Sequence, residues 1–157
     1  MKYVEAPDEY EPDGVPSVFL AGGISDCDAW QWRMADMLAP LDLVVLNPRR
    51  RHFPIDDPSA AEGQIRWEFR HLRRATARLF WFPSATLCPI TLYELGASSV
   101  APGPLFVGVD PAYARRRDVE IQTKLVRPDV RIVYSPDELA EQVKQFATQR
   151  SPKEVTP

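Results

Sequence analysis

The chain has few residues of the kinds that build metal centres and disulfide scaffolds. Only two cysteines, Cys27 and Cys88, and two histidines, His52 and His71, occur among its 157 residues, and there is no C-x-x-C spacing. A disulfide framework needs more cysteines, and a zinc site needs more ligands at closer spacing. We therefore expect a reduced, cytoplasmic protein that uses no metal and no other cofactor.

Long apolar runs and an excess of positive charge are also missing. No apolar run approaches the length that spans a membrane, and the first residues are acidic, unlike a secretory signal. The net charge is −3 at pH 7, which does not suit a broad surface for polyanions. The expected partners therefore include neither membranes nor polymeric nucleic acid.

Apolar runs and helical periods alternate along the chain. We expect strands at 17–21, 41–46, 78–82, 105–109 and 130–134, and helices at 29–38, 59–77, 90–100, 119–125 and 136–147. Such alternation predicts a doubly wound, five-stranded parallel sheet with helices on both faces. Residues 1–16 are acidic and rich in proline and are predicted to be a flexible arm. The domain then covers 17–147, and 148–157 is predicted to be a disordered tail.

The most informative stretch runs from Phe80 to Ser99. An aromatic strand is followed by a turn-rich segment and then by an apolar helix in which Glu94 is the only charge. Charged side chains are rarely buried unless they are paired or used. Near the start of its helix, the macrodipole would keep Glu94 ionised, and such a carboxylate is a good nucleophile toward a sugar C1′. The alternative is that Glu94 only caps the first turn.

Ligands of open parallel sheets bind at the carboxyl ends of the strands, where three loops are expected, at 22–28, 47–58 and 83–89. The first loop begins with Gly22 and Gly23, which let the backbone approach a ligand closely, although a tight turn explains them equally well.

Glu68 and Asp26 are the candidate partners of Glu94. Two carboxyl groups in different environments can divide the roles of nucleophile and proton donor. Glu68 could instead be a solvated residue paired with Arg66 or Arg70, and Asp26, like Asp28, could be a helix cap.

Further candidates for contacts with the substrate follow the same three loops and their flanking helices. Tryptophans at a pocket mouth stack on bases, Arg49 could meet a phosphate, and Ser98 could bond a hydroxyl or phosphate. The alternatives are core tryptophans, a solvated arginine run and a helix surface. The candidates are Phe19, Gly22, Gly23, Asp28, Trp30, Asn47, Arg49, Trp67, Cys88 and Ser98.

Four blocks in order resemble the nucleoside 2-deoxyribosyltransferase-like family. They lie at 19–24 (FLAGGI), 47–50 (NPRR), 64–68 (QIRWE) and 80–96, which ends in Glu94-Leu95-Gly96. The resemblance implies a flavodoxin-like fold, with Glu94 as the nucleophile that displaces the base and holds the deoxyribose as an ester. It implies that Glu68 orients the base or sugar and that Gly22, Gly23 and Asp26 line the pocket. It also implies a homo-oligomer whose subunits complete each other's sites.

The chain departs from the family pattern at two points. Residues 86–89 carry no acid where family members have an Asp that contacts the base, and Phe19 stands where Tyr is frequent. The leading hypothesis is exchange of bases on a deoxynucleoside through a covalent glycosyl-Glu94 intermediate, with a nucleoside or nucleotide and a free nucleobase as partners. Hydrolysis of the same bond, a catalytically silent nucleotide sensor and a purely structural domain are the alternatives.

Overall fold

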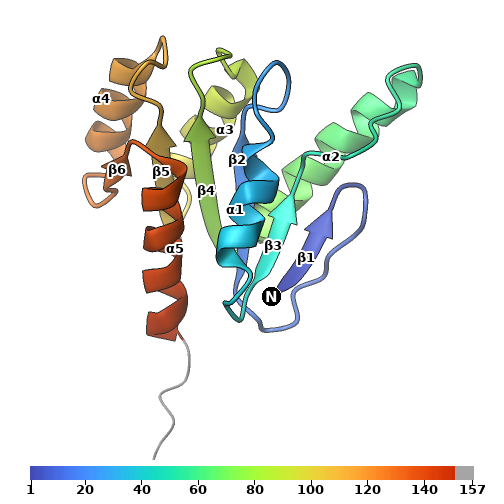
Figure 1. Cartoon of the computed structure of the whole chain (residues 1–157), viewed down its shortest axis with the longest axis horizontal. Helices are drawn as coiled ribbons and strands as arrows, with labels where there is room; N and C mark the ends of the chain where they lie inside the picture. Colours follow the sequence, from blue (N-terminus) through green and yellow to red (C-terminus); the bar gives the residue numbers. More distant parts are fainter. Residues whose placement is uncertain (151–157) are drawn as a thin grey trace, which may run out of the picture.

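The computed structural model describes residues 1–150 and has one parallel sheet between two helical layers (Figure 1). Its elements are β1 (Lys2–Glu5), β2 (Ser17–Gly22), α1 (Trp30–Leu38), β3 (Val44–Asn47), α2 (Pro58–Arg74), β4 (Ala77–Phe82), α3 (Pro89–Ser99), β5 (Leu105–Val109), α4 (Arg116–Val126), β6 (Ile132–Val133) and α5 (Pro136–Arg150). Every neighbouring pair of strands is parallel. The predicted doubly wound, flavodoxin-like architecture is confirmed, with six strands in place of five.

The strand order β1-β3-β2-β4-β5-β6 fixes where a ligand can bind. The chain moves from β2 outward to β3, then returns to β4 and moves outward to β5 and β6 on the other side. The direction changes between β2 and β4, which are hydrogen-bonded neighbours. In such sheets a crevice opens at the carboxyl ends of the two central strands. The loops after β2 and β4 therefore flank the expected site.

Side chains of the central strands alternate between the two layers. In β4, Phe80 and Phe82 belong to a core shared with α2, α3 and α4, whereas Leu79 and Trp81 belong to a core shared with α1 and α5. This alternation follows from the two-residue period of a strand. All six residues of β4 are buried, as expected for a strand covered on both faces.

The prediction of a flexible arm over 1–16 is wrong for the first residues, which form β1 at the edge of the sheet. β1 pairs with β3, and Val4, Ala6 and Tyr10 are buried. The acidic composition of residues 1–16 did not indicate a strand, because an edge strand tolerates charges that a central strand does not. Glu5 is one such charge, and it accepts hydrogen bonds from the Tyr3 hydroxyl and the Trp32 indole.

Several predicted helix ends also need correction. The residue before α1 is Ala29, which makes no side-chain capping bond, so Asp26 and Asp28 do not cap this helix. Ser135 caps the start of α5, since the Glu138 amide donates to Ser135 Oγ at 3.2 Å. This helix extends through 148–150, which were predicted to be disordered, and the rest of the predicted tail lies outside the described residues. Within 1–150, no helix is both long and apolar enough to cross a membrane.

Candidate active site

A cavity of about 580 Å³ opens beside the carboxyl ends of the central strands, on the side of α2 and α3. Phe19 and Ala21 of β2 form part of its wall, together with the loop from Gly22 to Ser25. α2 contributes Ile65, Glu68, Phe69, Leu72 and Arg73, and α3 with its preceding loop contributes Thr86, Cys88, Pro89, Ile90, Thr91, Tyr93, Glu94 and Ala97. The volume is in the range of small-molecule sites.

Glu94 is half-buried in this cavity and makes no hydrogen bond or ion pair with any residue in 1–150. It lies in the second turn of α3, and the first turn of this helix contains no acid, so Glu94 is not a cap. Burial, followed by the neighbouring charge of Glu68, raises the pKa of Glu94 to about 7. The expectation that the macrodipole keeps Glu94 fully ionised is therefore wrong, because that effect fades beyond the first turn.

Glu68 reaches the same cavity from α2. Its predicted alternative, a pairing with Arg66 or Arg70, does not occur, since Arg66 pairs with Glu62 and Arg70 pairs with Glu9. Burial raises the pKa of Glu68, and the opposing effect is a hydrogen bond from Gln64. Because the Glu68 charge is one cause of the Glu94 shift, the two carboxyl groups titrate as a coupled pair.

The two loops that frame the cavity are held close together at Gly23. A Cβ at this position would lie 2.8 Å from Pro83 Cγ and 3.0 Å from Cys88 Sγ, so only glycine permits the approach. Cys88 itself has a left-handed backbone (φ 47°) just before α3. Burial raises the pKa of Cys88 to about 11, which makes its thiol a neutral part of the wall. Tyr113 donates to the Leu87 carbonyl at 2.7 Å and fixes the second loop from outside.

The rim of the cavity is apolar and open to solvent. Ile65 and Phe69 of α2 are 65% and 56% exposed, and Ile90 and Tyr93 of α3 are 65% and 79% exposed. The helical period places Ile65 and Phe69 on one apolar stripe with Leu72, which is buried. α2 extends away from the sheet (Figure 1), and Ile65 and Phe69 stay exposed although they share this stripe. Tyr93 was not predicted as a site residue, although it is adjacent to Glu94 in the sequence.

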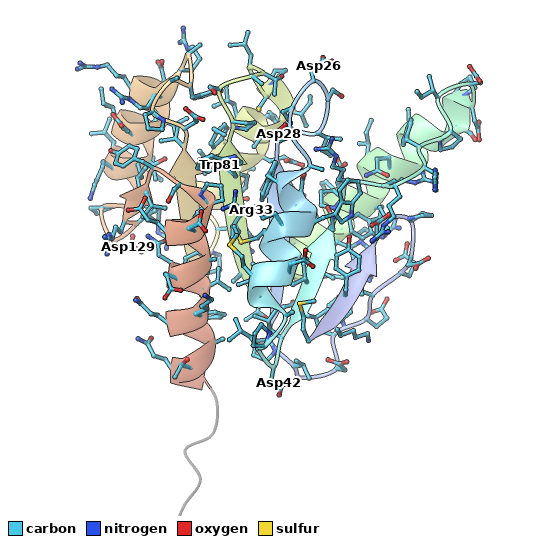
Figure 2. All side chains as sticks on the ribbon, viewed as in Figure 1. Asp26, Asp28, Arg33, Asp42, Trp81 and Asp129 are labelled. Carbon is cyan, nitrogen blue, oxygen red and sulfur yellow. The ribbon has the colours of Figure 1, made fainter. Side chains whose placement is uncertain are left out.

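Of the predicted site residues, Phe19, Gly22, Gly23, Glu68, Cys88 and Glu94 line the cavity. Asp26 and Asp28 do not. They are exposed and border a different hollow of about 620 Å³, together with Trp30, Arg33 and Trp81. Figure 2 shows both aspartates on the loop above α1. The structure therefore separates Asp26 from the Glu68 and Glu94 pair.

The remaining predicted residues support the site from outside it. Trp30 is buried and donates to the Gly23 carbonyl at 3.0 Å, which holds the glycine loop from the opposite face. Asn47 is buried against Tyr3, and Arg49 donates to the carbonyls of Cys27 and Asp28.

Two further candidates also lie outside the cavity lining. Trp67 is buried and stacks on His71 at 4.0 Å between ring centroids. Ser98 is buried in α3 and does not line the cavity.

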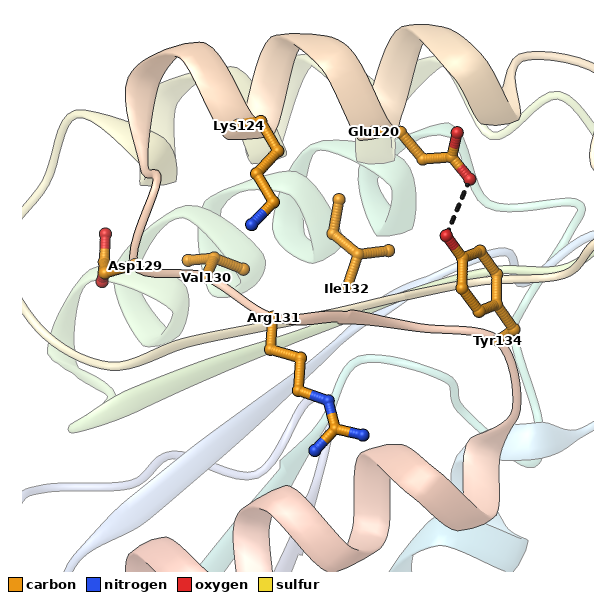
Figure 3. A pocket seen from close by; sticks show the side chains of 7 residues that line it. All are labelled: Glu120, Lys124, Asp129, Val130, Arg131, Ile132 and Tyr134. Atoms are coloured by element: carbon orange, nitrogen blue, oxygen red, sulfur yellow. Dashed lines mark hydrogen bonds between the residues drawn. The ribbon is translucent and has the colours of Figure 1, made fainter.

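A third hollow, of about 330 Å³, lies between α4 and the edge strand β6 (Figure 3). One hydrogen bond joins two of its lining side chains, from the Tyr134 hydroxyl to Glu120 at 3.0 Å. Of its two carboxyl groups, Asp129 is ion-paired with Arg127 at 2.8 Å, whereas Glu68 and Glu94 have no such cationic partner in the described part of the chain. The chemistry therefore favours the cavity between α2 and α3, although the hollow beside Asp26 is slightly larger.

Comparison with known proteins identifies the family of the chain. A family model described as "Nucleoside 2-deoxyribosyltransferase like" matches residues 15–113. The match covers more than half of the chain and includes every residue that lines the cavity. A search of curated proteins finds no match. With the parallel sheet, the position of the cavity and this match, the chain belongs to the nucleoside 2-deoxyribosyltransferase-like family.

Proposed function

We propose that this protein cleaves the N-glycosidic bond of a deoxynucleoside and transfers the sugar to a second nucleobase, with Glu94 as the nucleophile. The observation that carries the proposal is the pair of Glu68 and Glu94 in one apolar-walled cavity, where neither has a cationic partner among residues 1–150. Family membership supports the reaction class.

In the proposed first step, a Glu94 oxygen attacks C1′ and forms an ester as the bond from C1′ to the base nitrogen breaks. The electron pair of that bond goes to the base, and the base takes a proton from Glu68. In the second step, a nitrogen of the incoming base attacks C1′ and displaces the Glu94 carboxylate. The proton lost by this base returns to Glu68, so the enzyme ends in its starting state.

This division of roles depends on which carboxyl group holds the proton. The reactive form needs one proton on the pair, with Glu94 ionised and Glu68 protonated. Burial raises both pKa values, and the shift is larger for Glu94, so the free pair keeps its single proton mainly on Glu94. The proposed reaction therefore requires that substrate binding moves this proton from Glu94 to Glu68 before C1′ is attacked. Asp26 is not assigned as the proton donor, since it lies outside the cavity.

Hydrolysis is the second candidate, and the exposed rim of Ile65, Ile90 and Tyr93 favours it. Water that reaches the glycosyl ester would attack C1′ in place of a base. We propose that a second copy of the chain covers this rim in a homo-oligomer and thereby favours transfer over hydrolysis.

The test is to incubate the protein with a panel of deoxynucleosides and free bases and to separate the products by chromatography. We expect new nucleosides from base exchange, and Glu94→Ala should reduce the rate by about a thousand-fold or more. Glu62→Gln is the matched control, because Glu62 is an exposed acid of α2 paired with Arg66.

Each other outcome of this experiment has a defined meaning. Free base without exchange assigns hydrolysis. Binding of nucleosides without turnover assigns a sensor. Full activity in Glu94→Ala contradicts the proposal.

A further inference from the structure

Gln64 connects Glu68 to the loop after β3. It lies one turn before Glu68 on α2, and its Nε2 donates two hydrogen bonds, one to the Pro48 carbonyl at 2.6 Å and one to Glu68 Oε1 at 2.8 Å. Pro48 also lines the cavity. The amide of Gln64 thus bridges the backbone of one wall and the proton-handling carboxyl group of another.

The orientation of this amide is determined by the Pro48 carbonyl, which can only accept. Rotating the amide by 180° would place Gln64 Oε1 against the Pro48 carbonyl, and the 2.6 Å hydrogen bond to that carbonyl would be lost. The observed orientation persists although it leaves Gln64 Oε1 buried and without a partner in the described part of the chain. Glu68 Oε1 therefore faces an N–H group and must act as an acceptor.

Building on the function proposed above, we propose that Gln64 is a positioning residue that holds Glu68 Oε1 as an acceptor, so that Oε2 alone carries the proton given to the leaving base. A carboxyl group that can rotate freely would offer its proton from either oxygen. The bridge from Pro48 through Gln64 removes this ambiguity and fixes the direction from which the base is protonated.

The same hydrogen bond becomes stronger as the reaction proceeds. When Glu68 gives up its proton, negative charge develops on both of its oxygens, and an N–H group binds a carboxylate more strongly than the neutral acid. Stabilisation that increases toward the transition state accelerates the chemical step. In agreement with this direction, the Gln64 hydrogen bond lowers the pKa of Glu68 against the opposing effect of burial.

The other groups around Glu68 do not replace this interaction. From α3 and its preceding loop, the cavity receives Glu94, Tyr93 and Cys88, and from α2 itself it receives Arg73. Arg73 is engaged with Phe69, since its guanidinium lies 3.5 Å from the ring centroid and donates to the Phe69 carbonyl. The loop after β2 adds no charged side chain to the lining.

Two variants with opposite effects test the proposal. Gln64→Met keeps the shape and removes the donor, so the alkaline limb of the pH–rate profile should move to higher pH, and kcat should fall about 10-fold to 100-fold from lost alignment. Gln64→Lys keeps a donor and adds a positive charge, so this limb should move to lower pH. Glu62→Gln on the same helix should leave the pH–rate profile unchanged.

Carbon-13 NMR titration of the Glu68 carboxyl group in the substrate-free protein provides a readout independent of activity. We expect the pKa of Glu68 to rise in Gln64→Met and to fall in Gln64→Lys. Equal pKa values in the wild type and both variants would overturn the role of Gln64, whether or not base exchange is found. An inactive wild type with these two opposite shifts would instead overturn the proposed function and leave the Gln64 contact established.

Discussion

Burial and the neighbouring carboxyl group of Glu68 both favour the protonated form of Glu94. Both raise the pKa, to about 7, and no cation among residues 1–150 offsets them. The sequence indicated a lone acid in an apolar helix, and its position in the cavity agrees with that indication. It did not indicate that Glu68 would lie near enough to share the proton, because that proximity depends on how α2 and α3 are placed.

Replacing Glu68 by Gln should lower the pKa of Glu94. The variant removes the like charge, which is the second cause of the shift, and leaves burial, which is the first. The pKa of Glu94 should therefore fall below 7 but stay above about 4.5. NMR titration of the Glu94 carboxyl group measures this change. An unchanged pKa would mean that the two carboxyl groups do not interact.

At the scale of single elements, α2 has two functions. Its middle section places Glu68 and Gln64 at the cavity, and its last turn holds the N-terminal segment through His71. The His71 ring is fully buried, and its Nε2 accepts a hydrogen bond from the Tyr10 amide at 3.1 Å. Its Nδ1 lies 2.8 Å from the Trp67 carbonyl, so Nδ1 carries the hydrogen of the neutral ring. Protonation of Nε2 would break the contact with Tyr10.

The free energy of unfolding should therefore decrease as the pH drops below about 6.5. Burial lowers the pKa of His71, so the unfolded chain takes up a proton at a higher pH than the folded chain does. The nearby Glu9 opposes this shift, and Arg70 and Arg74 add to it.

His71→Phe should be less stable than the wild type at pH 7.5 and should lose about 1 kcal/mol less between pH 7.5 and pH 5. Urea unfolding at both pH values measures the difference. The same loss in both proteins would show that His71 does not titrate in this range.

At the scale of the whole molecule, the alternation of strands and helices was sufficient to predict the layers of the fold and the edge of the sheet at which the cavity opens. The sequence did not predict the segments in which the local pattern of apolar residues disagrees with the burial that the fold imposes. β1 looked like a polar arm because an edge strand needs few apolar residues. The sequence did not indicate that Ile65 and Phe69 would be exposed, because helical period cannot distinguish a buried stripe from a cavity rim.

The exposed rim leads to a prediction about assembly. We expect light scattering to give at least twice the monomer mass, because a second copy would cover Ile65, Ile90 and Tyr93. Ile90→Lys should shift the protein toward the monomer. Ile121→Lys on α4, where Ile121 is 51% exposed, is the matched control and should leave the mass unchanged. A monomeric wild type would contradict the proposal that a second copy of the chain covers the rim.

The common direction of all six strands has a practical consequence for handling this protein. Their amino ends share one edge of the sheet, and the cavity opens at the other, so Met1 lies far from the mouth (Figure 1). A biotin or an affinity tag attached at Met1 would fix the molecule to a sensor chip with its binding cavity facing the flowing solution.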